Sequence, residues 1–430
     1  MMPERKFKVL VIAYYFPPLG LSGVQRTFKF VKYMLRLNWE PTVLTSDKIA
    51  YYAYDNSLLR ELNSLNIRII RIAGKEPNSI LSKFGNLKPP REVFRKLFDI
   101  ISQSIFIPDN KISWSNAAAS EAEKLLNNEN FDIIYISSPP FSAFEKISKL
   151  RVKFEVPIII DYRDLWYNSY FSLYITPLHK LLNKNKEYKS LKNADAIIVT
   201  NRKIKEFLIK NYPFLTFDDV VIIPHGFDPE DFQASKPFTK PNNKLVIMYS
   251  GIFIGYGTPK YLLRAFKELV IERPDIAQNI ELHFVGYLRK ENLKLIKKLK
   301  LEEFVIDHGY VDHLTSISKI LSADVLWFMI DYRKNIDAIL PGKLYEYVGS
   351  GKPIFGCVPE GAAKQALQEY GASFICNPDD VEGIKSKLYE IYELFKNNKL
   401  PTASQEIINK YRRDLLTETL VKVFQSKLKV

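Results

Sequence analysis

Residues 340–356 combine charged side chains with the pattern of a loop, a short helix and a buried strand. Pro341 suits the first turn of the helix, and Gly349 and Gly351 suit its end. Glu346 stands in an otherwise apolar helix and needs a partner there, for which a bound hydroxylated ligand is one candidate. Ligands of open parallel sheets bind at the carboxyl edge of the strands, so we expect a binding site where this helix begins.

Glycine-containing turns that follow predicted strands are candidate anion sites. The first contains Gly20 and Gly23, before a helix whose N–H groups could bind an anion, and Ser22, which could cap that helix or donate to a ligand. Its spacing differs from Gly-x-Gly-x-x-Gly, which argues against a nicotinamide dinucleotide, and a plain strand–helix turn is the alternative. The second half has a similar loop and another helix start, with glycines at Gly251, Gly255, Gly257 and Gly361.

Charged side chains follow the apolar strand 157–161. Asp161, Arg163 and Asp164 would lie at the carboxyl end of a central strand, where side chains face a ligand. A structural ion pair of Arg163 with Asp161 or Asp164 is the alternative.

Apolar runs alternate with amphipathic helical patterns along the chain. This alternation predicts an α/β protein of parallel sheets covered by helices, with both faces of each sheet buried. A segment rich in Lys, Pro and Asn follows Pro224 and separates two such series. We therefore expect two doubly wound, Rossmann-like halves facing across a cleft.

The composition limits the class of protein. The chain has 430 residues, 47% of them hydrophobic and 26% charged, which is typical of globular proteins. No apolar run approaches the roughly 20 residues that span a bilayer. Two cysteines indicate a reduced, cytoplasmic setting, and no metal-ligand spacing is present.

The net charge of +14 permits nucleic acid, an anionic membrane or an anionic ligand as partner. No nucleic-acid-binding module is recognisable, so nucleic acid is not expected. Together with residues 167–174 and the lysine-rich stretch 180–192, a helix over 94–106 could dock on the inner face of a membrane. A core-facing helix and a solvated lysine face are the alternatives. The apolar face of the 94–106 helix would contain Phe94, Leu97, Phe98, Ile101 and Ile105.

Taken in order, several motifs resemble those of retaining glycosyltransferases of family 4, which have the GT-B fold. They are Tyr15-Phe-Pro-Pro with Gly20 and Gly23, Asp161-Tyr-Arg-Asp-Leu-Trp, Ile223-Pro-His-Gly-Phe-Asp, Tyr249-Ser-Gly and Lys343-Leu-Tyr-Glu-Tyr-Val-Gly-Ser-Gly-Lys-Pro. The second motif, with Asp109 and Trp114, resembles the bacterial surface-polysaccharide branch. The resemblance covers most of the chain.

The resemblance implies an acceptor-binding domain over residues 1–225 and a donor-binding domain over 226–407, with a last helix, about 408–430, packing back on the first. It implies a nucleotide-diphosphate sugar as donor substrate, without a further cofactor or metal. Glu346 would bind the donor ribose, and the base would lie near Gly309, Tyr310 and Val311. Further predicted donor contacts, including amides for the diphosphate, are Gly20, Ser22, Gly23, Ser250, Gly251, Leu344, Glu360, Gly361, Ala362 and Ala363.

Two departures from the family pattern concern charge. The first of two family glutamates corresponds to Ala338 here, and the Arg and Lys that usually follow the Tyr249-Ser-Gly strand have no match. Arg163, Lys343 or Lys260 would supply the positive charge that a diphosphate leaving group requires, and Lys343 lies in the motif itself. A surface lysine one turn from Glu346 is the alternative for Lys343.

The resemblance thus predicts a retaining sugar transfer by front-side attack, in which a phosphate oxygen takes the proton. The acceptor would be a glycan or a lipid-linked molecule in surface-polysaccharide synthesis. Asp164, Arg163 and Lys343 are the candidate catalytic residues, with Asp164 near the reacting carbon. A nucleotide-sugar 2-epimerase of the same fold and a non-catalytic sugar-nucleotide-binding relative are the alternatives.

Overall fold

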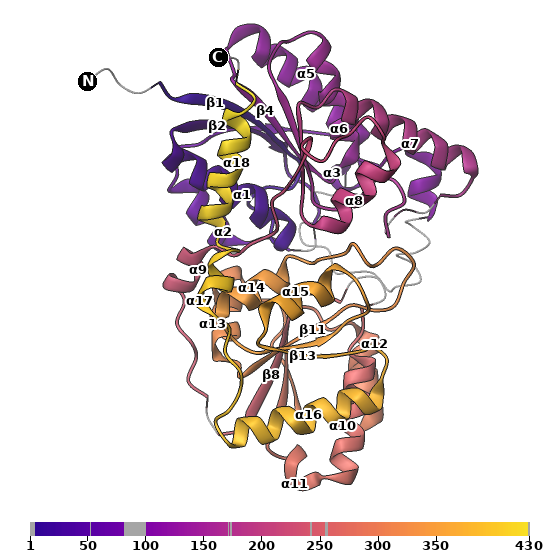
Figure 1. The fold of residues 1–430 in the computed structure, drawn as a ribbon, viewed down its shortest axis with the longest axis vertical. Coiled ribbons are helices and arrows are strands. Elements are labelled where there is room, and N and C mark those ends of the chain that lie inside the picture. The colour runs from indigo at the N-terminus through magenta and orange to yellow at the C-terminus, as the bar shows by residue number, and fades with distance from the viewer. Residues whose placement is uncertain are drawn as a thin grey trace. The chain divides into compact units, whose positions relative to one another are not determined.

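The computed structural model describes residues 5–51, 53–80, 100–170, 172, 174–240, 243–253 and 257–428, with Ser22 described by its backbone alone. Contacts divide the chain into two units. The first unit comprises Met1–His225 with Arg413–Val430, and the second comprises Gly226–Arg412. Figure 1 shows one sheet with its covering helices in each unit.

The first unit contains a seven-stranded sheet in the order β3-β2-β1-β4-β5-β6-β7, and all neighbouring strands are parallel. The central strands consist mostly of apolar residues, and nearly all of their residues are buried, as the sequence predicts. The strands are β1 Phe7–Ala13, β2 Trp39–Ser46, β3 Arg68–Ile72, β4 Ile133–Ser138, β5 Ile158–Tyr162, β6 Ala196–Val199 and β7 Val220–Ile222.

Helices cover this sheet, and the last helix of the chain, α18 (Arg413–Gln425), packs against the first helix, α1 (Ser22–Met34). The ring of Phe424 on α18 lies 5.1 Å from that of Trp39. Residues 100–105 are also helical, and the further helices with described bounds are η1 Leu35–Leu37, α2 Asn56–Asn63, α3 Pro77–Ile80, α5 Ile112–Asn128, α6 Phe141–Ile147, η3 Ser148–Val152, α7 Pro177–Lys192 and α8 Arg202–Asn211. No helix among the described residues is long and apolar enough to cross a membrane.

The second unit contains a six-stranded parallel sheet in the order β10-β9-β8-β11-β12-β13. Along β8, Leu245, Ile247 and Tyr249 belong to one apolar core, while Val246 and Met248 belong to another. Both faces of the sheet are therefore buried. The strands are β8 Leu245–Ser250, β9 Ile280–Val285, β10 Val305–Asp307, β11 Val325–Met329, β12 Ile354–Cys357 and β13 Ser373–Cys376.

The helices of the second unit cover the two faces of its sheet. Leu344 and Tyr347 of α14 belong to the same core as Val246, whereas Leu263 of α10 and Leu388 of α16 belong to the other. The bounds are α9 Pro229–Ala234, α10 Lys260–Glu272, α11 Pro274–Ala277, α12 Lys290–Leu299, α13 His313–Ser322, α14 Lys343–Ser350, α15 Ala362–Tyr370, α16 Val381–Lys396 and α17 Gln405–Asn409.

Candidate functional site

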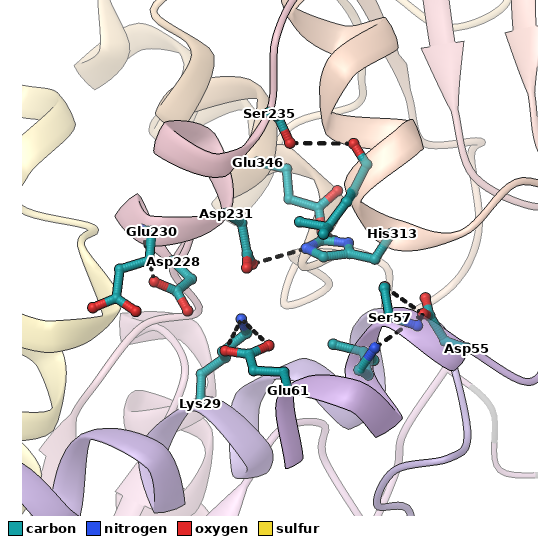
Figure 2. A network of polar contacts seen from close by, with 12 residues as sticks. Lys29, Asp55, Ser57, Glu61, Asp228, Glu230, Asp231, Ser235, His313 and Glu346 are labelled. Carbon is teal, nitrogen blue, oxygen red and sulfur yellow. Dashed lines mark hydrogen bonds and ion pairs between the residues drawn. The ribbon is translucent and has the colours of Figure 1, made fainter. Parts of the chain in front are cut away.

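Glu346 on the first turn of α14 has a histidine neighbour. His313 Nδ1 lies 3.9 Å from Glu346 Oε1, and His313 Nε2 lies 2.9 Å from Asp231 Oδ2 (Figure 2). Glu346 therefore has a protein neighbour on another helix, and its predicted contact with a bound hydroxylated ligand stays a prediction. The side chains of Glu346 and His313 remain 17% and 11% exposed, so the group is accessible from the surface of the second unit.

The packing of three helices fixes the position of His313. It is the first residue of α13, whose N-cap Asp312 accepts a hydrogen bond from the Thr315 backbone N–H at 3.1 Å. Ser235, just after α9, donates to the Leu314 carbonyl at 3.2 Å (Figure 2). Asp231 on α9 is thereby held beside the ring. No pattern near Glu346 in the sequence indicates these neighbours.

Lys343, one turn before Glu346, lies against an aromatic ring. Its Nζ donates to the Tyr249 hydroxyl and lies 4.1 Å from the centre of the Tyr249 ring. Burial lowers the pKa of Lys343 to about 7, although nearby Glu346 acts to raise it. Lys343 is thus a partly buried amine that changes charge near neutral pH, and the alternative of a surface lysine was wrong.

The ends of three strands meet at close-packed glycines. The Gly251 N–H donates to Val285 O at 2.8 Å, and the Gly286 N–H donates to Gly309 O at 2.8 Å. A Cβ at Gly286 would lie 2.1 Å from Gly251 O, so this close approach requires glycine. A Cβ at Gly251 would lie 2.9 Å from Lys343 Nζ, which places the amine directly beside the strand end.

Several predicted donor contacts have protein partners instead. The Ser250 N–H donates to Tyr347 Oη at 2.7 Å, and its hydroxyl shares a hydrogen bond with Ser316 at 2.8 Å. The Gly309 N–H donates to Asp307 Oδ1 at 3.0 Å. Leu344 is 1% exposed and packs in the core, so its side chain is not available to a ligand. The sequence could not distinguish these structural roles from ligand contacts.

Aromatic and apolar surfaces surround the predicted base position. The Tyr310 ring stacks on the Tyr287 ring at 5.5 Å with an angle of 9° between the planes. Val311 packs against the apolar core on the α14 face of the sheet. A planar base could stack on such a tyrosine pair.

Two of three backbone N–H groups at the start of α15 are available to bind an anion, and the N–H of Ala362 is not. The Ala362 N–H donates to Asp337 O at 2.7 Å, so the prediction that this amide binds the diphosphate was wrong. Among the described contacts, the N–H groups of Gly361 and Ala363 donate to no protein group. Glu360 forms an ion pair with Lys364 in the same turn.

Gly361 should be intolerant of any side chain. Its φ is +145°, and a Cβ would lie 2.6 Å from Asp337 O, which is backbone and cannot move aside. Gly361→Ala should therefore lower the free energy of unfolding by about 2–3 kcal/mol. Gly371→Ala is the matched control, because Gly371 has φ +79° but nothing within 4 Å of its Cβ position. It should cost only about 1 kcal/mol. Equal losses in chemical denaturation would contradict this.

In the first unit, Asp161 forms a buried ion pair with Arg26. Arg26 Nε and Nη2 each donate to the Asp161 carboxylate at 2.8 Å, and both side chains are fully buried. The Tyr135 hydroxyl also donates to Asp161, at 2.6 Å. Arg26 further donates to Pro224 O at 2.8 Å. The alternative of an ion pair between Arg163 and Asp161 was therefore wrong, and Asp161 joins α1, β4 and β5.

Arg163 donates to backbone carbonyls rather than facing an open site. Its Nε bonds to Ser138 O at 2.6 Å and its Nη2 to Pro139 O at 3.4 Å, while Nη1 bonds to Gly23 O. These bonds stabilise the turn that contains Gly23. Asp164 is partly buried, and burial raises the pKa of its carboxyl above the usual value against the opposing effect of Arg163.

Other predicted residues of the first unit have structural contacts. The Gly20 N–H donates to Ala53 O at 2.9 Å, so this amide is not free for a diphosphate. Asp109 accepts from the Ser142 N–H at 2.9 Å and thereby caps α6, and Trp114 is fully buried. Outside the described residues lie the Ser22 side chain, Gly255, Phe94, Leu97 and Phe98.

Part of the chain matches a known protein family by sequence. Residues 23–231 match the family described as Glycosyltransferase Family 4. This match covers just under half of the chain and supports a family 4 glycosyltransferase, an enzyme that transfers a sugar from a nucleotide donor. No curated protein sequence matches the chain.

Solved structures share the fold over nearly the whole chain. A sucrose-phosphate synthase from Thermosynechococcus elongatus has a TM-score of 0.66 at 13% identity, covering 98% of this chain and 99% of its own. WaaG, a glycosyltransferase involved in lipopolysaccharide biosynthesis, has a TM-score of 0.60 at 11% identity, and the match covers 97% of this chain and 99% of WaaG. A UDP-GlcNAc 2-epimerase from Neisseria meningitidis has a TM-score of 0.58 at 12% identity, and the match covers 98% of this chain and 100% of the epimerase. At such identities the likeness confirms the predicted GT-B-like α/β fold and nothing further.

Proposed function

We propose that this enzyme is a retaining glycosyltransferase whose second unit binds the donor nucleotide at the start of α14. The observation that carries the proposal is the arrangement of Glu346 and Lys343 on one turn, beside the glycine-rich strand ends. A carboxylate can accept hydrogen bonds from both ribose hydroxyls, and an ammonium can neutralise a diphosphate. Tyr287 and Tyr310 provide a stacking surface for the base.

In the reaction we propose, the protein forms no covalent bond to the sugar and acts by stabilising charge and orienting the reactants. As the diphosphate leaves, negative charge grows on its oxygens, and Lys343 with the N–H groups of Gly361 and Ala363 would stabilise that charge. The departing phosphate oxygen takes the proton of the acceptor hydroxyl as it attacks from the same face. In the first unit, we propose Asp164 as the group that orients the acceptor. Arg163 would hold the preceding turn, because its donors are engaged by carbonyls.

The acceptor class follows from the sequence motifs. Asp161-Tyr-Arg-Asp-Leu-Trp, with Asp109 and Trp114, resembles the bacterial surface-polysaccharide branch of the family. We therefore propose a glycan or lipid-linked acceptor from surface-polysaccharide synthesis.

The proposal is tested with a panel of nucleoside diphosphates and nucleotide sugars. Binding to the folded state should raise the melting temperature for one base in preference to the others. Incubation of the matching nucleotide sugar with a lipid-linked glycan should release nucleoside diphosphate and form an α- or β-glycoside with retained configuration. A new nucleotide sugar formed without nucleotide release would indicate an epimerase, and no thermal shift with any nucleotide would refute the donor site.

His313 should act by positioning Glu346. His313→Gln removes the imidazole ring that lies between the carboxylates of Asp231 and Glu346. Because Glu346 is then held less firmly, the affinity for the nucleoside diphosphate should fall by about 1 kcal/mol, or roughly fivefold. His283→Gln is the matched control, because His283 hydrogen-bonds Glu281 and His308 elsewhere in the same unit. Titration calorimetry measures both. An unchanged affinity in folded His313→Gln would exclude this role.

A further inference from the structure

Helix α7 is turned with its polar side inward. Its buried residues include Asn183, Glu187 and Ser190, whereas the exposed fractions of Leu178 and Leu181 are 60% and 63%. A surface helix normally directs its apolar stripe at the core. The reversed orientation of α7 presents apolar side chains to the surroundings, and Leu182 and Tyr188 are also exposed, at 36% and 37%.

Polar contacts fix this orientation. Trp166 Nε1 donates to Asn183 Oδ1 at 2.9 Å. Glu187 Oε2 accepts from the Tyr212 hydroxyl at 2.7 Å and from the Tyr167 N–H at 3.0 Å. Because these groups are buried, breaking the contacts would leave polar atoms unsatisfied. The outward leucines are therefore a stable feature of the fold.

A second apolar segment lies beside the first turn of α7. Residues 100–105 are helical, and His179 Nε2 lies 3.2 Å from the carbonyl oxygen of Ser104. Ile101 and Ile105 are 47% and 67% exposed, which excludes the core-facing alternative for these two residues. We define the α7 face as Ile101, Ile105, Ile175, Leu178, Leu181, Leu182 and Tyr188.

The charge around the α7 face is positive. Helix α7 carries five lysines, and its one acidic residue, Glu187, is fully buried. Lys186 pairs with Glu145 at 2.7 Å, whereas Lys180, Lys189 and Lys192 are exposed. Apolar side chains flanked by lysines complement the acyl chains and the anionic headgroups of a lipid bilayer.

We propose that the α7 face docks this enzyme on an anionic lipid bilayer. The leucines enter the headgroup boundary, and the lysines contact the headgroups. The inward side of the same helix holds Trp166 and Tyr167, which follow Arg163 and Asp164 in the chain after one intervening residue, Leu165. Docking would therefore place the turn that contains Arg163 and Asp164 near the membrane surface, and Asp164 is the group that we propose to orient the acceptor. Only this last step depends on the proposed function.

Vesicle co-sedimentation tests the docking. Wild-type protein should bind phosphatidylcholine vesicles that contain phosphatidylglycerol, and bind less as salt is raised. Lys180→Gln/Lys189→Gln should weaken binding about tenfold or more, and Leu178→Ser/Leu181→Ser should do likewise. Matched controls are Lys297→Gln/Lys298→Gln on α12 and Ile271→Ser, which alter exposed residues of the second unit.

Two further measurements make the result decisive. All variants should keep the melting temperature and the nucleotide affinity of the wild type, because the altered side chains are exposed; this separates docking from the donor site. Absence of vesicle binding, or equal binding by the α7 variants and the controls, would overturn the proposal. A concentration-dependent mass in light scattering that the leucine variant abolishes, without vesicle binding, would assign the face to a second copy of the chain instead.

Discussion

Lys343→Met should reduce the rate of sugar transfer about 100-fold or more, because removal of a group that stabilises developing charge typically has that effect. Methionine keeps the apolar contact with the Tyr249 ring and removes the buried amine. The fold should therefore be retained, and initial rates with the nucleotide sugar measure the loss. Lys352→Met, just beyond the end of α14, is the matched control and should keep most activity.

Lys343 should also make donor binding depend on pH. Its pKa of about 7 in the folded protein lies below the usual 10.5, so the amine is largely neutral above pH 7 and must gain a proton to pair with a diphosphate. Relative to Lys343→Met, the diphosphate affinity of the wild type should fall by up to about tenfold per pH unit above 7. A pH-independent ratio of the two affinities would contradict this role.

The same shift has a consequence for stability. The pKa of Lys343 is lower in the folded protein than in the unfolded chain. At a pH where the unfolded chain binds the proton and the folded protein does not, the free energy of unfolding is reduced. This loss of stability is absent above about pH 10.5, grows as the pH falls towards 7, and is constant below pH 7. Lys343→Met should therefore be more stable than the wild type near neutral pH, as measured by denaturant unfolding.

Glu346→Gln should weaken nucleoside-diphosphate binding about 10- to 100-fold, the usual cost of losing a charged hydrogen bond of about 1.5–3 kcal/mol. Glutamine has nearly the same shape, so His313 and the packing of α14 stay in place. Glu390→Gln on α16 changes an exposed carboxylate and should have no effect. Titration calorimetry measures these affinities.

A nucleotide without the ribose hydroxyls sharpens the Glu346 test. If Glu346 binds the ribose, the wild type should bind the 2′,3′-dideoxy nucleotide less tightly than the ribonucleotide, and Glu346→Gln should bind both almost equally. This double comparison isolates the contact from any general effect on the fold. If the variant discriminated between the two nucleotides as strongly as the wild type, Glu346 would not be the ribose ligand.

Hydrophobic patterns were sufficient to predict the strands and the parallel sheets. The apolar run predicted at 157–161 corresponds to β5, and its continuous burial follows from helices on both faces. The same patterns carry no information on which charged residues meet. Arg26 pairs with Asp161 from 135 positions away, and His313 reaches Glu346 from another helix. Such partners depend on how strand ends and helix starts are arranged in space.

Helix α7 shows a related limit. The sequence left membrane docking and an ordinary solvated helix as alternatives for this stretch, because it does not reveal which side of the helix faces the core. The buried partners of Asn183 and Glu187 are Trp166, Tyr167 and Tyr212, which lie in other segments. Likewise, Leu344 and the Ala362 amide fit a ligand-binding motif in sequence but serve the packing of the second unit.

Titration of the wild type, Glu346→Gln and Lys343→Met with ADP, GDP and UDP at pH 8 tests the central claim most directly. We predict that the wild type binds one of these nucleotides in preference to the others and takes up a proton as it does so. Glu346→Gln should bind more weakly with the same proton uptake, and Lys343→Met should bind more weakly with none. Equal affinities for all three proteins, or no binding by the wild type, would contradict a donor site at the start of α14.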